Sequence, residues 1–130
     1  MEFKFKARKN PNIELYDPND YNIAVKFAKK AYKEFGTFIR AIVLFGAAAR
    51  KQKAQDIDIL VIVDDVRISI TKEIVETYRI ITEKIVLDTS SRLHITTLKF
   101  TTFWDMIRAA DPIAINILSC LLYTSPSPRD

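Results

Sequence analysis

Cysteine, glycine and long apolar runs are all scarce in this sequence of 130 residues. The single cysteine, Cys120, excludes an internal disulfide and a zinc site built from several cysteines. No apolar run approaches the roughly 18 residues that a transmembrane helix needs, so we expect no membrane association. The N-terminal stretch MEFKFKARKN lacks an apolar signal core, and we therefore expect a cytoplasmic protein without an export signal.

Basic residues are concentrated in the first half of the chain. Residues 1–55 contain 12 Lys and Arg against 5 Asp and Glu, whereas residues 56–130 contain 8 against 11. A basic half can attract a polyanion such as a nucleotide or RNA. The lysines of KFAKKAYKEFG also suit the solvated face of a helix, which is the interpretation we favour, with RNA binding as a weaker alternative. We expect residues 1–17 to form a basic N-terminal arm.

The end of the sequence differs in composition from the rest. Residues 120–130 read CLLYTSPSPRD, and prolines at this spacing cannot continue a helix. The string matches, residue for residue, the translation of a common transposon-end sequencing adapter. We therefore expect residues 120–130 to be a non-native tail and the native chain to be cut at about Ser119, with a native proline-rich linker as the alternative.

The hydrophobic pattern predicts helices and strands in alternation. Helical periodicity marks three segments, the first of which ends at Gly36, and β-branched apolar runs mark three strands. The predicted helices cover residues 17–36, 68–88 and 101–119, and the predicted strands cover 38–46, 57–63 and 92–98. Thr101 or Thr102 is the expected cap of the last helix. The order α-β-β-α-β-α implies an α+β domain over residues 18–119, a small mixed β-sheet with helices packed on it.

Two aspartates stand one residue apart at the head of the second predicted strand. Residues i and i+2 of a strand point to the same face, so the side chains of Asp56 and Asp58 are expected roughly 7 Å apart. A cation between them would offset their repulsion, and Mg²⁺ binds carboxylate oxygens together with substrate phosphates. The pair therefore indicates a metal and nucleotide site, with solvated strand ends as the alternative. Asp64 lies too far along the strand to join, and we expect Asp64 and Asp65 to end it in solvent.

A glycine ends the first predicted strand, ten residues before the aspartate pair. Because Gly46 lacks a Cβ, the backbone can turn sharply there and a phosphate can approach the following amides. If the residues after it open a helical turn, their free N–H groups form an anion site, to which Arg50 adds charge. Arg50 suits a surface ion pair equally well.

The segment VLFGAAARKQKAQDIDILVIV, residues 43–63, resembles the minimal nucleotidyltransferases of the DNA polymerase β superfamily. Their signature is a strand ending in Gly-Ser, an Ala-Arg-Gly loop and an Asp-x-Asp on the next strand, and Gly46, Arg50, Asp56 and Asp58 fall on these positions. The resemblance implies a polymerase β palm-like fold, with Mg²⁺ held by Asp56 and Asp58 and nucleotide phosphate bound at Gly46, Ala47 and Arg50.

The activity that this resemblance implies is transfer of a nucleoside monophosphate from an NTP to a hydroxyl on a protein, an RNA or a small molecule. Some members of the superfamily are antitoxins, commonly prokaryotic, that modify a toxin ribonuclease. A toxin-type protein is therefore a further partner that the resemblance implies.

Three positions depart from the signature. Ala47 replaces the serine, Lys51 replaces the glycine after the arginine, and the third predicted strand has no acid where the family has its third carboxylate. By strand parity His94 is the nearest equivalent, with a structural role or a partner contact as the alternative for it. An imidazole can ligate a metal but brings no negative charge when neutral. The alternative function is therefore a catalytically impaired binding module, such as an antitoxin-like partner of a toxin.

Overall fold

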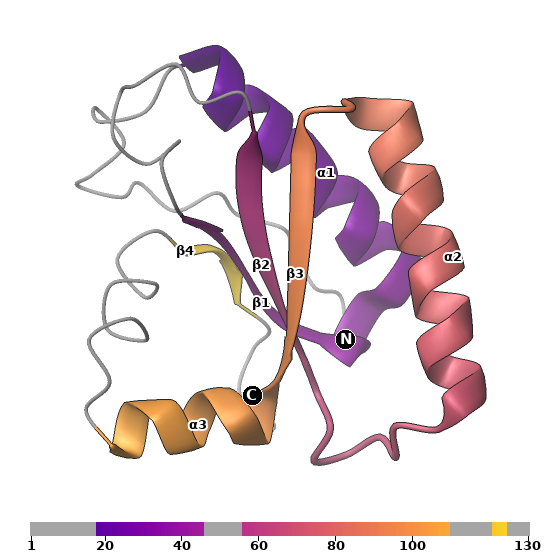
Figure 1. Ribbon diagram of the computed structural model, residues 1–130, viewed down its shortest axis with the longest axis vertical. Coiled ribbons are helices and arrows are strands. Elements are labelled where there is room, and N and C mark those ends of the chain that lie inside the picture. The colour runs from indigo at the N-terminus through magenta and orange to yellow at the C-terminus, as the bar shows by residue number, and fades with distance from the viewer. Residues whose placement is uncertain (1–17, 46–55, 110–120, 125–130) are drawn as a thin grey trace.

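The computed structural model describes residues 18–45, 56–109 and 121–124. These residues form a four-stranded mixed sheet in the order β3-β2-β1-β4 with helices packed around it, which confirms the predicted α+β class (Figure 1). The helices are α1 (Pro18–Phe35), the 3₁₀ turn η2 (Gly36–Phe38), α2 (Lys72–Thr89) and α3 (Phe100–Arg108). The strands are β1 (Ile39–Phe45), β2 (Ile57–Val63), β3 (Leu93–Lys99) and β4 (Leu121–Thr124).

Strand directions differ across the sheet. β1 runs antiparallel to β2, and β2 runs parallel to β3, to which it is connected through α2. β4 pairs antiparallel with the outer side of β1. This short strand lies inside the segment expected to be an adapter-derived tail, and the origin of that segment stays a prediction.

The two central strands form the buried core. Ile39, Ile42, Val43 and Leu44 of β1 are fully buried, and every residue of β2 except Asp58 is buried. Since neighbouring residues of a strand point to opposite faces, both faces of this strand pair are covered. Burying an Ile, Leu or Val side chain contributes about 1.5–3 kcal/mol, so the strand pair is a large part of the core.

Helix α1 covers the sheet with its apolar face. Its buried apolar residues are Ala24, Phe27, Ala28 and Ala31. The helix ends where Gly36 adopts a φ of 54°, a backbone conformation that favours glycine. The stop signal in the sequence therefore acts through backbone geometry.

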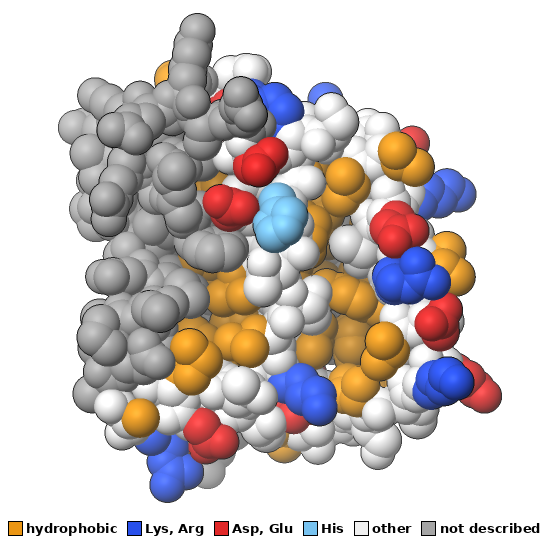
Figure 2. All heavy atoms as spheres, in the orientation of Figure 1, with side chains coloured by type: hydrophobic (Ala, Val, Ile, Leu, Met, Phe, Trp, Pro, Cys, Tyr) orange, Lys and Arg blue, Asp and Glu red, His pale blue; other side chains and the backbone are white. Residues whose placement is uncertain are grey.

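Helix α2 stands beside β3 and packs against α1, and a hollow lined by apolar side chains separates it from β3 (Figures 1 and 2). The helix begins at Lys72, four residues later than predicted, because the Thr71 hydroxyl accepts a hydrogen bond from the Ile74 N–H at 3.2 Å and caps it. Ile70 therefore lies before the helix. Val75, Ile80 and Leu87 remain exposed on α2.

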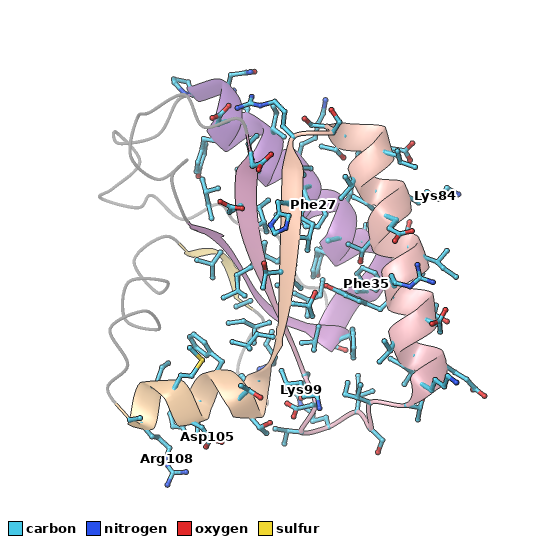
Figure 3. All side chains as sticks on the ribbon, in the orientation of Figure 1. Phe27, Phe35, Lys84, Lys99, Asp105 and Arg108 are labelled. Atoms are coloured by element: carbon cyan, nitrogen blue, oxygen red, sulfur yellow. The ribbon has the colours of Figure 1, made fainter. Side chains whose placement is uncertain are left out.

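Aromatic side chains close the space between α1 and α2. The rings of Phe35, Phe38 and Tyr78 form a cluster with centroid distances of 5.0, 6.0 and 6.4 Å. Figure 3 shows Phe35 between the sheet and α2, with Phe27 further along α1.

None of the helices within the described residues combines the length and apolar character needed to cross a bilayer.

Candidate metal and nucleotide site

Three strand ends meet at one edge of the sheet. Phe45, the last residue of β1, pairs with Asp58 near the start of β2, and Asp58 pairs with His94 near the start of β3. The three ends meet because β1 pairs antiparallel with β2, whereas β2 pairs parallel with β3. The segment 46–55 leaves β1 and enters β2 at this same edge.

Asp58 and His94 are in direct contact. Asp58 Oδ1 lies 3.3 Å from His94 Nδ1, and the two side chains are 28% and 66% exposed. Asp56 is exposed and comes immediately before β2. The contact follows from the sheet, since β2 and β3 run parallel with Asp58 opposite His94. The role of His94 as the equivalent of a third carboxylate stays a prediction.

The described residues supply only part of a metal site. Among them, no group of three or more His, Cys, Asp or Glu lies close enough to hold a metal ion. Asp58 and His94 form a pair that faces solvent, so a cation bound there would take its remaining ligands from substrate or water. Figure 2 shows acidic side chains beside the histidine on an open part of the surface.

The predicted phosphate-binding residues Gly46, Ala47 and Arg50 lie outside the described residues, as does Lys51. The structure describes the two residues that flank this segment, Phe45 before it and Asp56 after it. Phe45 pairs with Asp58 across β1 and β2, so the residue that precedes the segment lies opposite Asp58.

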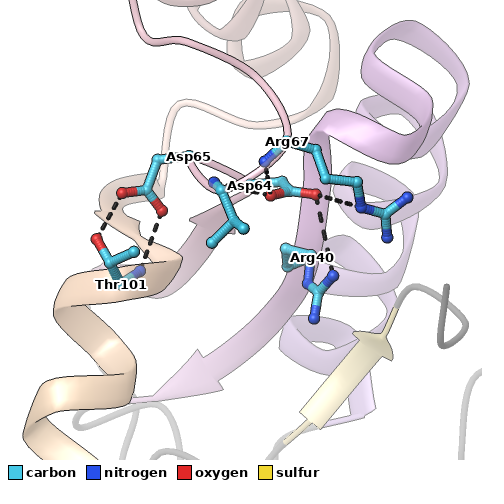
Figure 4. A network of polar contacts seen from close by, with 6 residues as sticks. Arg40, Asp64, Asp65, Arg67 and Thr101 are labelled. Carbon is cyan, nitrogen blue, oxygen red and sulfur yellow. Dashed lines mark hydrogen bonds and ion pairs between the residues drawn. The ribbon is translucent and has the colours of Figure 1, made fainter.

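The opposite end of β2 was predicted wrongly. Asp64 is only 1% exposed and does not end the strand in solvent. Its Oδ1 accepts hydrogen bonds from the N–H groups of Val66 and Arg67 at 3.0 and 3.1 Å, while its Oδ2 lies 3.3 Å from Arg67 Nε and 3.9 Å from Arg40 (Figure 4). The turn amides and the two guanidinium groups make burial of this carboxylate tolerable.

Asp65 caps the start of α3. We expected the side chain of Thr101 or Thr102 to cap this helix. The Asp65 carboxylate accepts hydrogen bonds from the N–H and the hydroxyl of Thr101, at the start of α3. Burial acts to raise the pKa of Asp65, but the Thr101 hydrogen bonds and the charge of Lys99 together hold it below its ordinary value. Asp65 therefore ties the end of β2 to α3.

One ion pair near the candidate site was not anticipated. Asp20, buried in the first turn of α1, accepts a hydrogen bond of 2.8 Å from the guanidinium of Arg92. The carbonyl of Arg92 in turn accepts a hydrogen bond from Ile57 N at 2.8 Å. The pair thereby links α1 to the start of both β2 and β3. Because Asp20 and Arg92 are 72 positions apart in the sequence, no local signal predicts the contact.

No protein-family model matches the chain, and neither a curated protein nor a solved structure shows significant similarity to it.

Proposed function

We propose that this chain is a Mg²⁺-dependent nucleotidyltransferase that transfers a nucleoside monophosphate from an NTP to a hydroxyl acceptor. The observation that supports the proposal is the meeting of three strand ends, where Phe45 pairs with Asp58 and Asp58 pairs with His94. In the sequence, Gly46 directly follows Phe45, and Arg50 comes four residues after Gly46. A polymerase β palm-like fold is part of the proposal.

The exposed carboxylates fit the metal that this chemistry uses. Asp56 is exposed and Asp58 is partly exposed, so their oxygens can reach a hydrated cation. Mg²⁺ commonly takes one or two protein carboxylates and completes its shell with substrate phosphates and water. When bound, Mg²⁺ would supply charge neutralisation at the phosphates. Asp56 and Asp58 are the residues that would hold it.

His94 gives the site a group that can accept a proton. At 3.3 Å, Asp58 Oδ1 is placed to accept the Nδ1 proton, which leaves the lone pair on His94 Nε2. In the reaction the acceptor oxygen bonds to the α-phosphorus and the bond to the bridging oxygen breaks. Pyrophosphate leaves with the electron pair, and the acceptor proton passes to Nε2. His94 then stands in for the base-like role of the missing third carboxylate.

The first test is thermal unfolding with and without Mg²⁺ and each NTP. A preferred NTP at about 100 times its Kd should stabilise the protein by about 2.7 kcal/mol, and only in the presence of Mg²⁺. Asp56→Asn and Asp58→Asn should abolish the stabilisation. Asp105→Asn is the matched control, because Asp105 is exposed on α3, away from the three strand ends (Figure 3). Absence of stabilisation in the parent protein would remove the proposal.

The second test separates binding from transfer. His94→Gln should keep the Mg²⁺–NTP stabilisation and lower the transfer of label from an α-labelled NTP by roughly 100-fold or more, the scale of a lost general base. Equal transfer in His94→Gln and the parent protein would refute the role of His94 as proton acceptor.

A catalytically impaired binding module, such as an antitoxin-like partner of a toxin, is the second candidate. The feature that favours it is the absence of any acid in β3, Leu93–Lys99, where His94 takes the expected position. Stabilisation by Mg²⁺–NTP without label transfer to any acceptor would select this alternative. Salt-sensitive RNA binding that survives both aspartate substitutions would instead select a basic RNA-binding domain.

A further inference from the structure

A second feature of the molecule, the groove between α2 and β3, has the character of a ligand site. Its volume is about 770 Å³, within the range of roughly 300–1,000 Å³ that small-molecule sites occupy. Figure 2 shows apolar side chains gathered in this hollow. Those that line it include Ile74, Val75, Val86, Leu87, Leu93 and Ile95.

The groove is elongated, because it follows β3 from Leu93 to Lys99. Six residue steps along a strand span roughly 20 Å. Phe38 and Tyr78, two members of the aromatic cluster, also line the groove. The site therefore suits a long apolar body better than a compact polar one.

The hydroxyl groups in the groove wall gather around Tyr78. Tyr78 Oη and Thr97 Oγ1 lie 2.6 Å apart, and the side chain of Thr82, which is 8% exposed and also lines the groove, interacts with the Tyr78 hydroxyl as well. These hydroxyl groups therefore interact with one another.

The two basic side chains along the groove, Arg79 and Lys99, differ in their ion pairing. Arg79 is held by Glu76 at 3.1 Å and Glu83 at 3.2 Å, so its charge is balanced. Lys99, at the opposite end from His94, forms no ion pair with any residue that the structure describes. Its charge acts on Asp65, but that carboxylate is already bonded to Thr101. Lys99 therefore offers a cation to an anionic group at one end of an apolar groove.

We propose that the α2–β3 groove binds a small anionic amphiphile, with its apolar body along β3 and its anionic group at Lys99. A medium-chain carboxylate has this chemistry. The proposal does not rest on the nucleotidyltransferase function, because Asp56 and Asp58 do not line the groove, and His94, which does, lies at the opposite end of it from Lys99.

The experiment uses the full chain and two probes, anilinonaphthalene sulfonate as a fluorescent reporter and decanoate as its competitor. The reporter should bind saturably at one site per chain, and decanoate should displace it without Mg²⁺ or NTP. Lys99→Gln should weaken decanoate binding by about three- to ten-fold through loss of a charge-assisted contact. The same substitution should leave the binding of uncharged decanol unchanged.

Two exposed apolar residues of α2 provide a matched pair of variants. Val75 is 49% exposed and lines the groove, whereas Ile80 is 56% exposed and does not. Val75→Glu should weaken decanoate binding by about ten-fold or more, since it removes apolar contact and adds a like charge. Ile80→Glu, which makes the same change in net charge, should leave binding within about two-fold of the parent, less than about 0.4 kcal/mol. Circular dichroism would establish that both variants are folded.

Several outcomes would overturn the proposal. Lack of saturable binding would do so, as would equal weakening by Val75→Glu and Ile80→Glu. A concentration-dependent dimer that Val75→Glu dissociates, without decanoate binding, would assign the groove to a second copy of the chain instead. Asp58→Asn should leave decanoate binding unchanged whether or not the nucleotidyltransferase proposal holds, so the two proposals can fail separately.

Discussion

The two ends of strand β2 carry the same residue type in opposite surroundings. Asp64, at the C-terminal end, is buried and bonded to two backbone amides and two arginines. At the N-terminal end Asp58 is partly exposed and lies 3.3 Å from His94 Nδ1, and Asp56 is exposed. A carboxylate whose acceptor sites are filled by the protein stabilises the fold, whereas one that keeps free acceptor sites can bind a ligand. This difference in surroundings is the reason why we assign Asp64 to the fold and propose Asp56 and Asp58 as binding residues.

The largest expected effect of substitution is at the buried end. Asp64→Ala should lower the free energy of unfolding by about 2–4 kcal/mol, because it leaves the turn amides and the two arginines without their shared partner. Urea denaturation monitored by circular dichroism measures this. Asp64→Asn serves as the graded control, since its amide oxygen can still accept from the turn while the ion pairs are lost. A cost below about 1 kcal/mol for Asp64→Ala would contradict the assigned role.

The second-largest loss of stability is expected for the Asp20–Arg92 ion pair, which links α1 to the start of β2 and β3. Asp20→Ala should cost about 1–3 kcal/mol, because Arg92 loses its buried partner but is itself partly exposed and can be hydrated. Arg92→Lys keeps the charge but not the planar fork, so it should lose only part of this amount. Identical losses from Asp20→Ala and from Arg92→Lys would show that the fork geometry, and not the charge, carries the interaction.

The Asp65–Thr101 contact should produce a smaller and pH-dependent effect. Thr101→Val should cost about 1 kcal/mol at neutral pH, the usual scale of a helix cap. Because the folded-state pKa of Asp65 lies below its ordinary value of 3.8, the stabilisation is present above that value and is lost as the pH falls through the folded pKa. Urea titrations should therefore show the cost shrinking in strong acid. Thr102→Val, an exposed neighbour, should show neither the cost nor its pH dependence.

The order of elements could be predicted from the sequence because it depends on local periodicity. The run over 57–63 gave β2 with its observed bounds, and Gly36 marked the end of α1. The role of Asp64 could not be predicted, because Arg40 reaches it from another strand. The cap of α3 likewise comes from Asp65, 36 residues before Thr101. At the candidate site, strand parity singled out His94 within the third strand, but its contact with Asp58 depends on the register of β2 with β3, and the groove depends on how α2 stands beside β3.

The smallest change in stability is expected at the exposed end of β2. The Asp58–His94 pair is largely solvated, and such pairs contribute about 0–1 kcal/mol. Asp56→Asn should change the free energy of unfolding by less than about 0.5 kcal/mol, or raise it slightly, because it removes one of two neighbouring like charges. Asp58→Asn should cost less than about 1 kcal/mol by the same reasoning.

The two ends of β2 are best compared by measuring the free energy of unfolding of variants at each end, first in Mg²⁺-free buffer and then with Mg²⁺ and NTP. Asp64→Ala should be destabilised in both buffers and should still gain stability from the ligand. Asp58→Asn should resemble the parent in the first buffer and fail to gain in the second. A large loss of stability from Asp58→Asn without ligand would assign this end of the strand to the fold as well. Near-neutral stability combined with loss of the ligand response is the behaviour of a carboxylate retained for binding, because its free acceptor sites contribute nothing until a cation or phosphate arrives.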